Sequence, residues 1–117
     1  MTSPTGIDPT ELPATIRSYL VAHGARDTDA AFRAFSPDAV VVDDGRVFRG
    51  SDEVLEFLQN AGVEFSYTIE LVGSERIDDD HWVVRNHLEG DFPGGVADLT
   101  YRFTMDGDRI AELVIAG

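Results

Sequence analysis

Residues 35–54 read FSPDAVVVDDGRVFRGSDEV, and they set the order of three structural elements. The run of small apolar residues that Asp43 closes predicts a buried strand with an acid at its end. The pair Asp44-Gly45 is typical of a two-residue hairpin turn, which reverses the chain into a short return strand. Ser51 is a favoured helix N-cap, and the two acidic residues after it suit the positive end of the helix dipole. This segment therefore predicts a strand, a hairpin and a helix, in that order.

Two further helices are predicted before this segment. The first begins near Thr10, accepts Pro13 in its first turn and ends at Gly24. The second is capped by Asp27 and runs from Thr28 to Phe35. The faces that these helices turn inward consist of Leu12, Ile16, Tyr19, Leu20 and His23 in the first and Ala31, Phe32 and Phe35 in the second.

The second half of the chain is predicted to contain strands only. Period-two alternation and turns rich in glycine or aspartate predict strands over residues 64–72, 81–92, 96–105 and 109–116. Helices first and strands afterwards are typical of an α+β domain. We therefore expect a curved antiparallel sheet that wraps as a cone around the three N-terminal helices, with a pocket at the open end. Residues 1–9 are expected to form a flexible tail, and residues 10–117 the single domain.

The composition argues against several classes of function. The chain has 117 residues and a formal net charge of −13, so its surface repels phosphate backbones and anionic membranes. It has no cysteine, and its three histidines are not closely spaced, so the sequence has no metal motif. No apolar run approaches the roughly 20 residues of a membrane span, and the N-terminus lacks a secretory signal. We expect a cytoplasmic protein with no metal or cofactor and no nucleic-acid or membrane partner.

Several local stretches carry a resemblance to a known family. They are DTDAAF at 27–32, FSPDAV at 35–40, FRGSDEV at 48–54, YRF at 101–103 and GDRI at 107–110. Over residues 10–116 the chain resembles the nuclear transport factor 2-like superfamily, within its SnoaL-like branch, whose relatives include polyketide cyclases and steroid delta-isomerases. The resemblance implies a domain that binds a small hydrophobic molecule and forms a homodimer through the convex face of its sheet. Because this fold hosts many unrelated functions, the reaction must be argued from the site.

Among these relatives, the steroid delta-isomerases offer a mechanistic template. They place an oxyanion-donating tyrosine on the first helix and a general-base aspartate at the end of the first strand. Tyr19 and Asp43 have similar spacings here. Those enzymes also use an aspartic acid on a late strand as a second donor. The nearest candidate is Asp98, whose parity sets it on the opposite face from Phe103, and Tyr101 takes an inward position instead.

The residues themselves leave two interpretations of each candidate open. An acid at the mouth of a buried apolar strand is partly desolvated, which would raise the pKa of Asp43 toward the range of a general base. Alternatively, Asp43 belongs with Asp44 to the turn chemistry before Gly45. Tyr19 is either a core residue or a hydroxyl donor that reaches the cavity and stabilises an enolate oxygen.

A set of ring-bearing residues is predicted to line the pocket beside these two. The set consists of Phe35, Phe57, Phe65, Trp82, His87, Tyr101 and Phe103. The strand 81–92 leaves one point open, because either its His87 face or its Asn86 face could be the concave one. His87 is accordingly an acid or base, a hydrogen-bonding group or a structural residue.

Two hypotheses of function follow. The first is a cofactor-free isomerase or cyclase that acts on a hydrophobic carbonyl compound in a water-poor pocket, with Asp43 as the base and Tyr19 as the oxyanion donor. The second is a non-catalytic domain that holds an apolar ligand or a protein partner, with Asp43 neutralised by Arg46 or Arg49. A raised pKa of Asp43 favours chemistry, and a depressed pKa favours a structural role.

Overall fold

Helices dominate the first half of the chain in the structure, a computed structural model that describes residues 5–60 and 66–117. A 3-10 helix, Pro9–Glu11, precedes α1 (Ala14–Gly24), α2 (Thr28–Arg33) and α3 (Gly50–Asn60). Asp27 caps α2 as expected, because its carboxylate accepts a hydrogen bond from the backbone N–H of Ala30. The first helix starts later than expected. Leu12 is extended, since a residue that precedes a proline disfavours the helical region.

Seven strands form one sheet within the described part of the chain. They are β1 (Thr5–Gly6), β2 (Phe35–Asp43), β3 (Arg46–Arg49), β4 (Tyr67–Arg76), β5 (His81–Gly90), β6 (Val96–Asp106) and β7 (Arg109–Ala116). Their order across the sheet is β1-β4-β5-β6-β7-β2-β3. The α+β class is confirmed. The pairing is antiparallel as expected except between β2 and β7, which run parallel.

The parallel pair is possible because a long connection separates its two strands. Parallel neighbours need a crossover, and here the chain from β3 to β6 provides it. The hairpin that starts this connection has the predicted turn. Asp44 and Gly45 have φ angles of 51° and 82°, both in the left-handed region that a type I′ turn requires. Asp43 then pairs with Arg46 across the hairpin.

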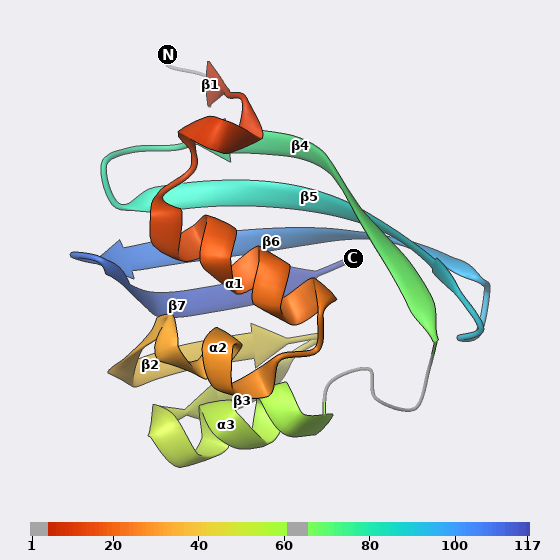
Figure 1. Cartoon of the computed structure of the whole chain (residues 1–117), viewed down its shortest axis with the longest axis horizontal. Coiled ribbons are helices and arrows are strands. Elements are labelled where there is room, and N and C mark those ends of the chain that lie inside the picture. The colour runs from red at the N-terminus through yellow and green to blue at the C-terminus, as the bar shows by residue number, and fades with distance from the viewer. Residues whose placement is uncertain (1–4, 61–65) are drawn as a thin grey trace.

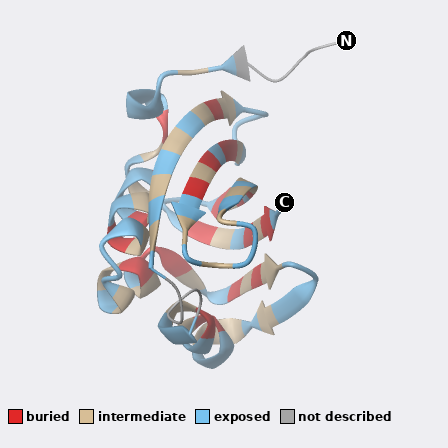
Figure 2. Cartoon of the chain, turned by 90° about the vertical axis from the view of Figure 1, so that its right-hand side faces the viewer, coloured by how far each residue is buried: buried red, intermediate tan, exposed pale blue. Residues whose placement is uncertain are grey.

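The helices lie on the concave face of the curved sheet (Figure 1). α1 crosses in front of the strands, while α2 and α3 lie beside β2 and β3. Figure 2 shows that buried and exposed positions alternate along the strands, so that one face of the sheet belongs to the core. The largest fully buried side chains are Tyr19, Phe103, Ile16, Ile110, Leu113, Val41, Val54 and Val84. The core therefore lies between α1 and the inner face of the sheet.

The segment before the first helices pairs with the edge of the sheet. Thr5 and Gly6 pair with Arg76 and Glu75 of β4. The backbone N–H of Ile7 also donates to the carbonyl of Ser74 at 2.9 Å. An edge strand offers unpaired backbone groups, and this short segment satisfies some of those of β4, between Ser74 and Arg76. Residues 1–4 lie outside the described ranges.

The strand boundaries differ from the prediction by a few residues. β7 has the predicted bounds, and β6 runs one residue further. β5 ends at Gly90, and β4 extends to Arg76 past an irregularity between Leu71 and Gly73, which strict alternation did not reveal. Phe35 begins β2 rather than ending α2. The register of β2 against β7 shifts after Phe35, where the segment 36–38 contains a proline that cannot donate to the ladder.

Gly90 allows β4 and β5 to approach each other closely. A Cβ atom there would clash with the carbonyl oxygen of Ser66 and would lie 2.8 Å from Cα of Tyr67. We therefore expect Gly90→Ala to lower the free energy of unfolding by about 1–3 kcal/mol in urea denaturation. Gly73→Ala is the matched control, because its Cβ would meet only the side chain of Arg85, at 3.7 Å or more. Equal stability of the two variants would contradict this account.

Candidate functional site

The end of β2 places Asp43 on the inner face of the sheet. Asp43 shares the parity of Val41, which is fully buried. It pairs with Ile115 of β7, and Ile115 pairs with Tyr101 of β6. These three residues thus form a row across three neighbouring strands, with the backbones of Asp43 and Tyr101 roughly 10 Å apart. The carboxyl group of Asp43 and the phenol of Tyr101 therefore lie on the same inner face of the sheet.

The environment of Asp43 disfavours its charged form. The residue is half-buried, and this burial is the main cause that raises the pKa of its carboxyl group. The neighbouring negative charge of Asp44 raises the pKa further, and the positive charge of Arg46 opposes both. Among the residues that the structure describes, no ion pair joins Asp43 to Arg46 or Arg49. The pKa is therefore shifted in the direction expected of a general base, not of an ion-paired carboxylate.

Tyr19 is fully buried on α1. Its ring stacks on His23 at 5.7 Å and meets the edges of Phe35 and Phe103 at 5.4 and 5.8 Å. Its hydroxyl group has no hydrogen-bond partner among the described residues. Burial raises the pKa of Tyr19 well above its ordinary value, and the nearby Tyr101, Tyr67 and Asp43 add to the rise. The Tyr19 hydroxyl thus stays protonated and keeps a hydrogen to donate.

Tyr101 and His23 form a second polar pair in the same interior. The Tyr101 hydroxyl oxygen lies 3.4 Å from Nε2 of His23. Burial raises the pKa of Tyr101, with smaller contributions from Tyr67 and from the charge of Asp43. Burial lowers the pKa of His23, and the positive charge of Arg26 lowers it further. The imidazole is therefore neutral at neutral pH.

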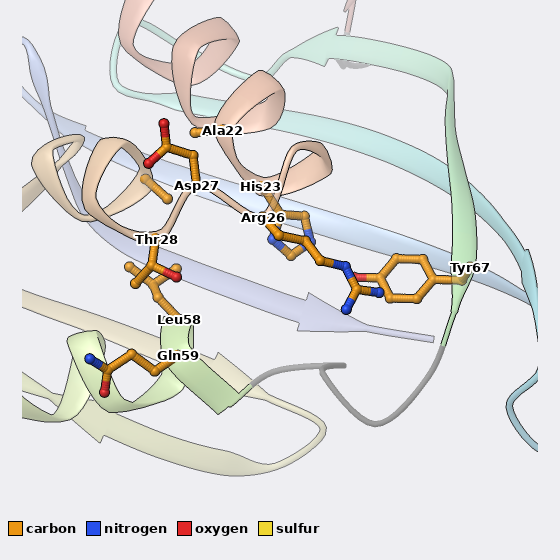
Figure 3. A pocket seen from close by; sticks show the side chains of 9 residues that line it. Ala22, His23, Arg26, Asp27, Thr28, Leu58, Gln59 and Tyr67 are labelled. Carbon is orange, nitrogen blue, oxygen red and sulfur yellow. The ribbon is translucent and has the colours of Figure 1, made fainter.

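A hollow of about 80 Å³ opens beside His23. Figure 3 shows side chains that line it. The hollow lies between the α1–α2 turn, the end of α3 and the start of β4. In Figure 3 the side chain of Arg26 extends toward Tyr67, and its guanidinium carbon lies 5.0 Å from the centre of the Tyr67 ring. The residues that line the hollow are Ala22, His23, Arg26, Asp27, Thr28, Ala31, Leu58, Gln59 and Tyr67.

A second hollow of the same size lies at Asp43. Its lining consists of Asp43, Arg46, Phe48, Glu56, Phe57 and Asn60, so it opens between the β2–β3 hairpin and α3. Tyr19 lines neither hollow. The two hollows have no lining residue in common.

Most of the ring-bearing residues predicted for the pocket belong to the core. Phe35, Phe57, Tyr101 and Phe103 are buried, and Trp82 packs partly buried against them. Only Phe57 lines one of the two hollows described above. Phe65 lies outside the described residues.

The structure places His87 on the outer face of β5, one of the two alternatives that the sequence left open. The inner face of β5 is the Asn86 face, because Val84 belongs to the core and Asn86 is buried. His87 lies on the outer face, where Nδ1 is 2.6 Å from the carboxylate of Asp98 and Nε2 is 3.3 Å from that of Glu89. Hydrogen bonds to Asp98 and then Glu89 raise the pKa of His87. Asp98 is on the outer face too, as its parity predicted, so it supplies no second donor to the interior.

The sequence placed His23 on the inward face of the first helix, four residues after Tyr19, but gave it no role in the site. The contact with Tyr101 joins residues far apart in the chain and had no local signal.

The fold and this site are those of a small α+β domain with polar groups held inside an aromatic core. The description SnoaL-like domain matches residues 16–113. The chain belongs to this SnoaL-like family. No curated protein is a significant match to it.

Solved structures agree with this assignment. A candidate polyketide cyclase from Sinorhizobium meliloti is 37% identical, with a TM-score of 0.85 over 94% of this chain and 100% of that one. A protein from Catenulispora acidiphila with a ketosteroid isomerase-like fold, solved with trimethylamine, has a TM-score of 0.77 over 90% and 85% of the chains at 14% identity. TerC, co-crystallised with polyporic acid, has a TM-score of 0.74 over 87% of both chains at 17% identity. At such low identity, the last two show the fold alone.

Within residues 5–60 and 66–117, no group of three or more histidine or acidic side chains is arranged to hold a metal ion. No helix there is long and apolar enough to cross a membrane.

The two tyrosines should respond differently to loss of their hydroxyl groups. Tyr19→Phe removes a buried donor that has no partner within residues 5–60 and 66–117, so we expect the free energy of unfolding to stay the same or rise by about 1 kcal/mol. Tyr101→Phe removes a hydroxyl that contacts His23, and should lower it by about 1 kcal/mol. Urea denaturation measures both. A Tyr19→Phe variant less stable than Tyr101→Phe would show that the Tyr19 hydroxyl has a stabilising partner.

Proposed function

We propose that this domain binds a small hydrophobic carbonyl compound in its interior and transfers a proton next to the carbonyl, as a cofactor-free isomerase or cyclase. Asp43 is the general base in this proposal, and Tyr19 donates a hydrogen bond to the carbonyl oxygen. The observation that carries the proposal is the environment of Asp43. Its pKa is raised chiefly by burial, and its charge acts on the buried Tyr19 hydroxyl, which has no partner among the described residues.

The proposed reaction begins with removal of a proton by the Asp43 carboxylate. The proton comes from the carbon next to the carbonyl, and the electrons of that C–H bond form the carbon–carbon double bond of an enolate. The carbonyl π electrons move to the oxygen, where the Tyr19 O–H stabilises the new negative charge. In an isomerase, protonated Asp43 returns the proton to another carbon of the enolate. In a cyclase, the enolate carbon attacks a second carbonyl carbon of the same molecule, whose oxygen takes the proton.

The surroundings support an apolar substrate. Phe35 and Phe103 pack against Tyr19, so the environment of its hydroxyl is dry and strengthens any hydrogen bond to a bound oxygen. The relative from Sinorhizobium meliloti, as a candidate polyketide cyclase, supports carbonyl chemistry. TerC has the same fold and was co-crystallised with polyporic acid, so this fold can accommodate a small organic ligand.

One observation favours a second function, a domain that binds a ligand without chemistry. The hollows beside Asp43 and beside His23 are small and separate, and Tyr19 lines neither. A ligand held in either hollow alone would not contact both proposed catalytic groups. The experiment below separates these functions, because it measures binding and proton transfer independently.

Asp43→Asn should abolish proton transfer without loss of stability. We expect exchange of the α-hydrogens of cyclohexanone in D₂O, followed by proton NMR, to slow by at least roughly 100-fold, because the amide cannot accept the proton. Stability should stay near wild type or rise, since burial disfavours the charge of Asp43. Asp44→Asn is the matched control, because asparagine tolerates the left-handed φ of 51° there.

Three outcomes distinguish the functions. Exchange that Asp43→Asn abolishes and Asp44→Asn preserves supports the role of Asp43 as the general base. Binding of cyclohexanone without exchange supports the non-catalytic domain. Undiminished exchange by Asp43→Asn would show that another group removes the proton.

The pH profile should identify Asp43 through its neighbours. A base works only as the carboxylate, so exchange should fall as the pH is lowered through the pKa of Asp43, which burial raises above its ordinary value. Asp44→Asn removes a negative charge that raises this pKa. It should therefore move the acid limb of the profile, where exchange falls at low pH, to lower pH. Arg46→Gln removes a positive charge and should move it to higher pH. A limb that neither variant moves would belong to another group.

A further inference from the structure

We infer that His23 is a positioning residue, which orients the Tyr101 hydroxyl so that Tyr101 donates a second hydrogen bond to the oxygen of the bound carbonyl compound. The identity of that oxygen rests on the proposed function. The role of His23 does not depend on whether Asp43 removes a proton. His23 acts through Tyr101, and only Tyr101 would touch the ligand.

The geometry fixes the His23 ring between the two tyrosines. It stacks on the Tyr19 ring at 5.7 Å with an interplanar angle of 14°. It meets the Tyr101 ring at 6.1 Å and 62°, an edge-on arrangement. Nε2 of His23 lies 3.4 Å from the Tyr101 hydroxyl oxygen. The imidazole is therefore held by one tyrosine and directed at the hydroxyl group of the other.

The tautomer of His23 decides what Tyr101 can do. With the hydrogen on Nδ1, Nε2 is an acceptor and takes the hydrogen of the Tyr101 hydroxyl, which then cannot be donated to a ligand. With the hydrogen on Nε2, His23 donates to the hydroxyl oxygen, and the Tyr101 hydrogen is free for the ligand. The inference therefore requires the Nε2–H tautomer.

Burial and the charge of Arg26 leave the His23 ring neutral, so that the ring exists as one of two tautomers. The groups that face His23 are Tyr19 on its own helix, Arg26 and Asp27 in the following turn, Tyr67 on β4, Tyr101 on β6 and the charge of Asp43 beyond Tyr101. Burial is the main cause that opposes protonation of His23, and the charge of Arg26 adds to it.

The position of Tyr101 suits a second donor. It lies in the row with Ile115 and Asp43, so its hydroxyl points into the interior where the base would act. Asp98, the late-strand acid, lies on the outer face beside His87 and is unsuitable for this role. An oxygen that accepts from both Tyr19 and Tyr101 is one with two lone pairs available, as in a ketone or its enolate.

The tautomer can be measured directly on the full chain. Long-range ¹H–¹⁵N NMR at neutral pH distinguishes Nε2–H from Nδ1–H for each of the three histidines. His23→Gln assigns the signal by its loss. We expect the Nε2–H pattern for His23. The Nδ1–H pattern, or a protonated ring, would overturn the inference whether or not the protein has any activity.

Substitutions test whether His23 acts through Tyr101. Cyclohexanone labelled with ¹³C at its carbonyl reports donated hydrogen bonds by a downfield shift. We expect a smaller bound shift in Tyr101→Phe and in His23→Phe, and recovery in His23→Gln, whose amide N–H can replace Nε2–H. Exchange should slow by roughly 100-fold in Tyr101→Phe, as for loss of one oxyanion donor. His87→Gln, on the outer face, is the matched control and should match wild type.

A double variant gives the decisive comparison. If His23 acts only through Tyr101, then His23→Phe should have no further effect on the carbonyl shift in the Tyr101→Phe background. Additive effects, or a His23→Gln variant no better than His23→Phe, would show that His23 has only a packing role. Far-ultraviolet circular dichroism of each variant excludes misfolding as the cause. Loss of exchange in Asp43→Asn with an unchanged carbonyl shift would separate failure of the base from failure of the donors.

Discussion

The parallel pairing of β2 with β7 is the constraint on which the whole interior depends. Through it Asp43 is one strand away from Ile115 and two from Tyr101. Side chains alternate along a strand, so a slip of one residue would turn Asp43 outward and Val42 inward. The backbone N–H of Asp44 donates to the carbonyl of Ile115 at 3.2 Å and helps to hold this register at the strand end. The position of the acid thus follows from pairing between the first long strand and the last.

The same interior carries polar groups that reduce stability. Tyr19, Ser74, Trp82 and Asn86 each have a buried polar atom without a protein partner in the described chain. An unsatisfied buried group costs about 1–3 kcal/mol, which is large against the roughly 5–15 kcal/mol that stabilise a typical domain. A phenylalanine would fill the place of Tyr19 without that cost. A bound oxygen that accepts from its hydroxyl gives a physical reason for tyrosine at this position.

Local chemistry made part of this structure predictable. The hairpin at Asp44-Gly45 and the Asp27 cap depend on neighbouring residues alone, and both were correct. The inward direction of Asp43 follows from its parity with Val41, which is also local. The parallel strand pair, the ordered residues 5–9 and the inner face of β5 depend on contacts between distant segments. Apolar residues occupy both faces of β5, since Val83 and Val84 are both buried, so hydrophobicity alone could not choose between them.

Charge conservation links the proposed roles of these residues. A neutral ketone and ionised Asp43 carry one negative charge together, and so do the enolate and protonated Asp43. Proton transfer therefore moves a charge across the site without creating one. Burial raises the pKa of Asp43, so the interior holds the charge on the carboxylate less well than water does. Burial also raises the pKa values of Tyr19 and Tyr101. Both phenols therefore stay protonated and, in the proposed reaction, can donate hydrogen bonds to the enolate oxygen. In the proposed reaction, the raised pKa of Asp43 reduces the difference in free energy between the two locations, which is what catalysis of enolate formation requires.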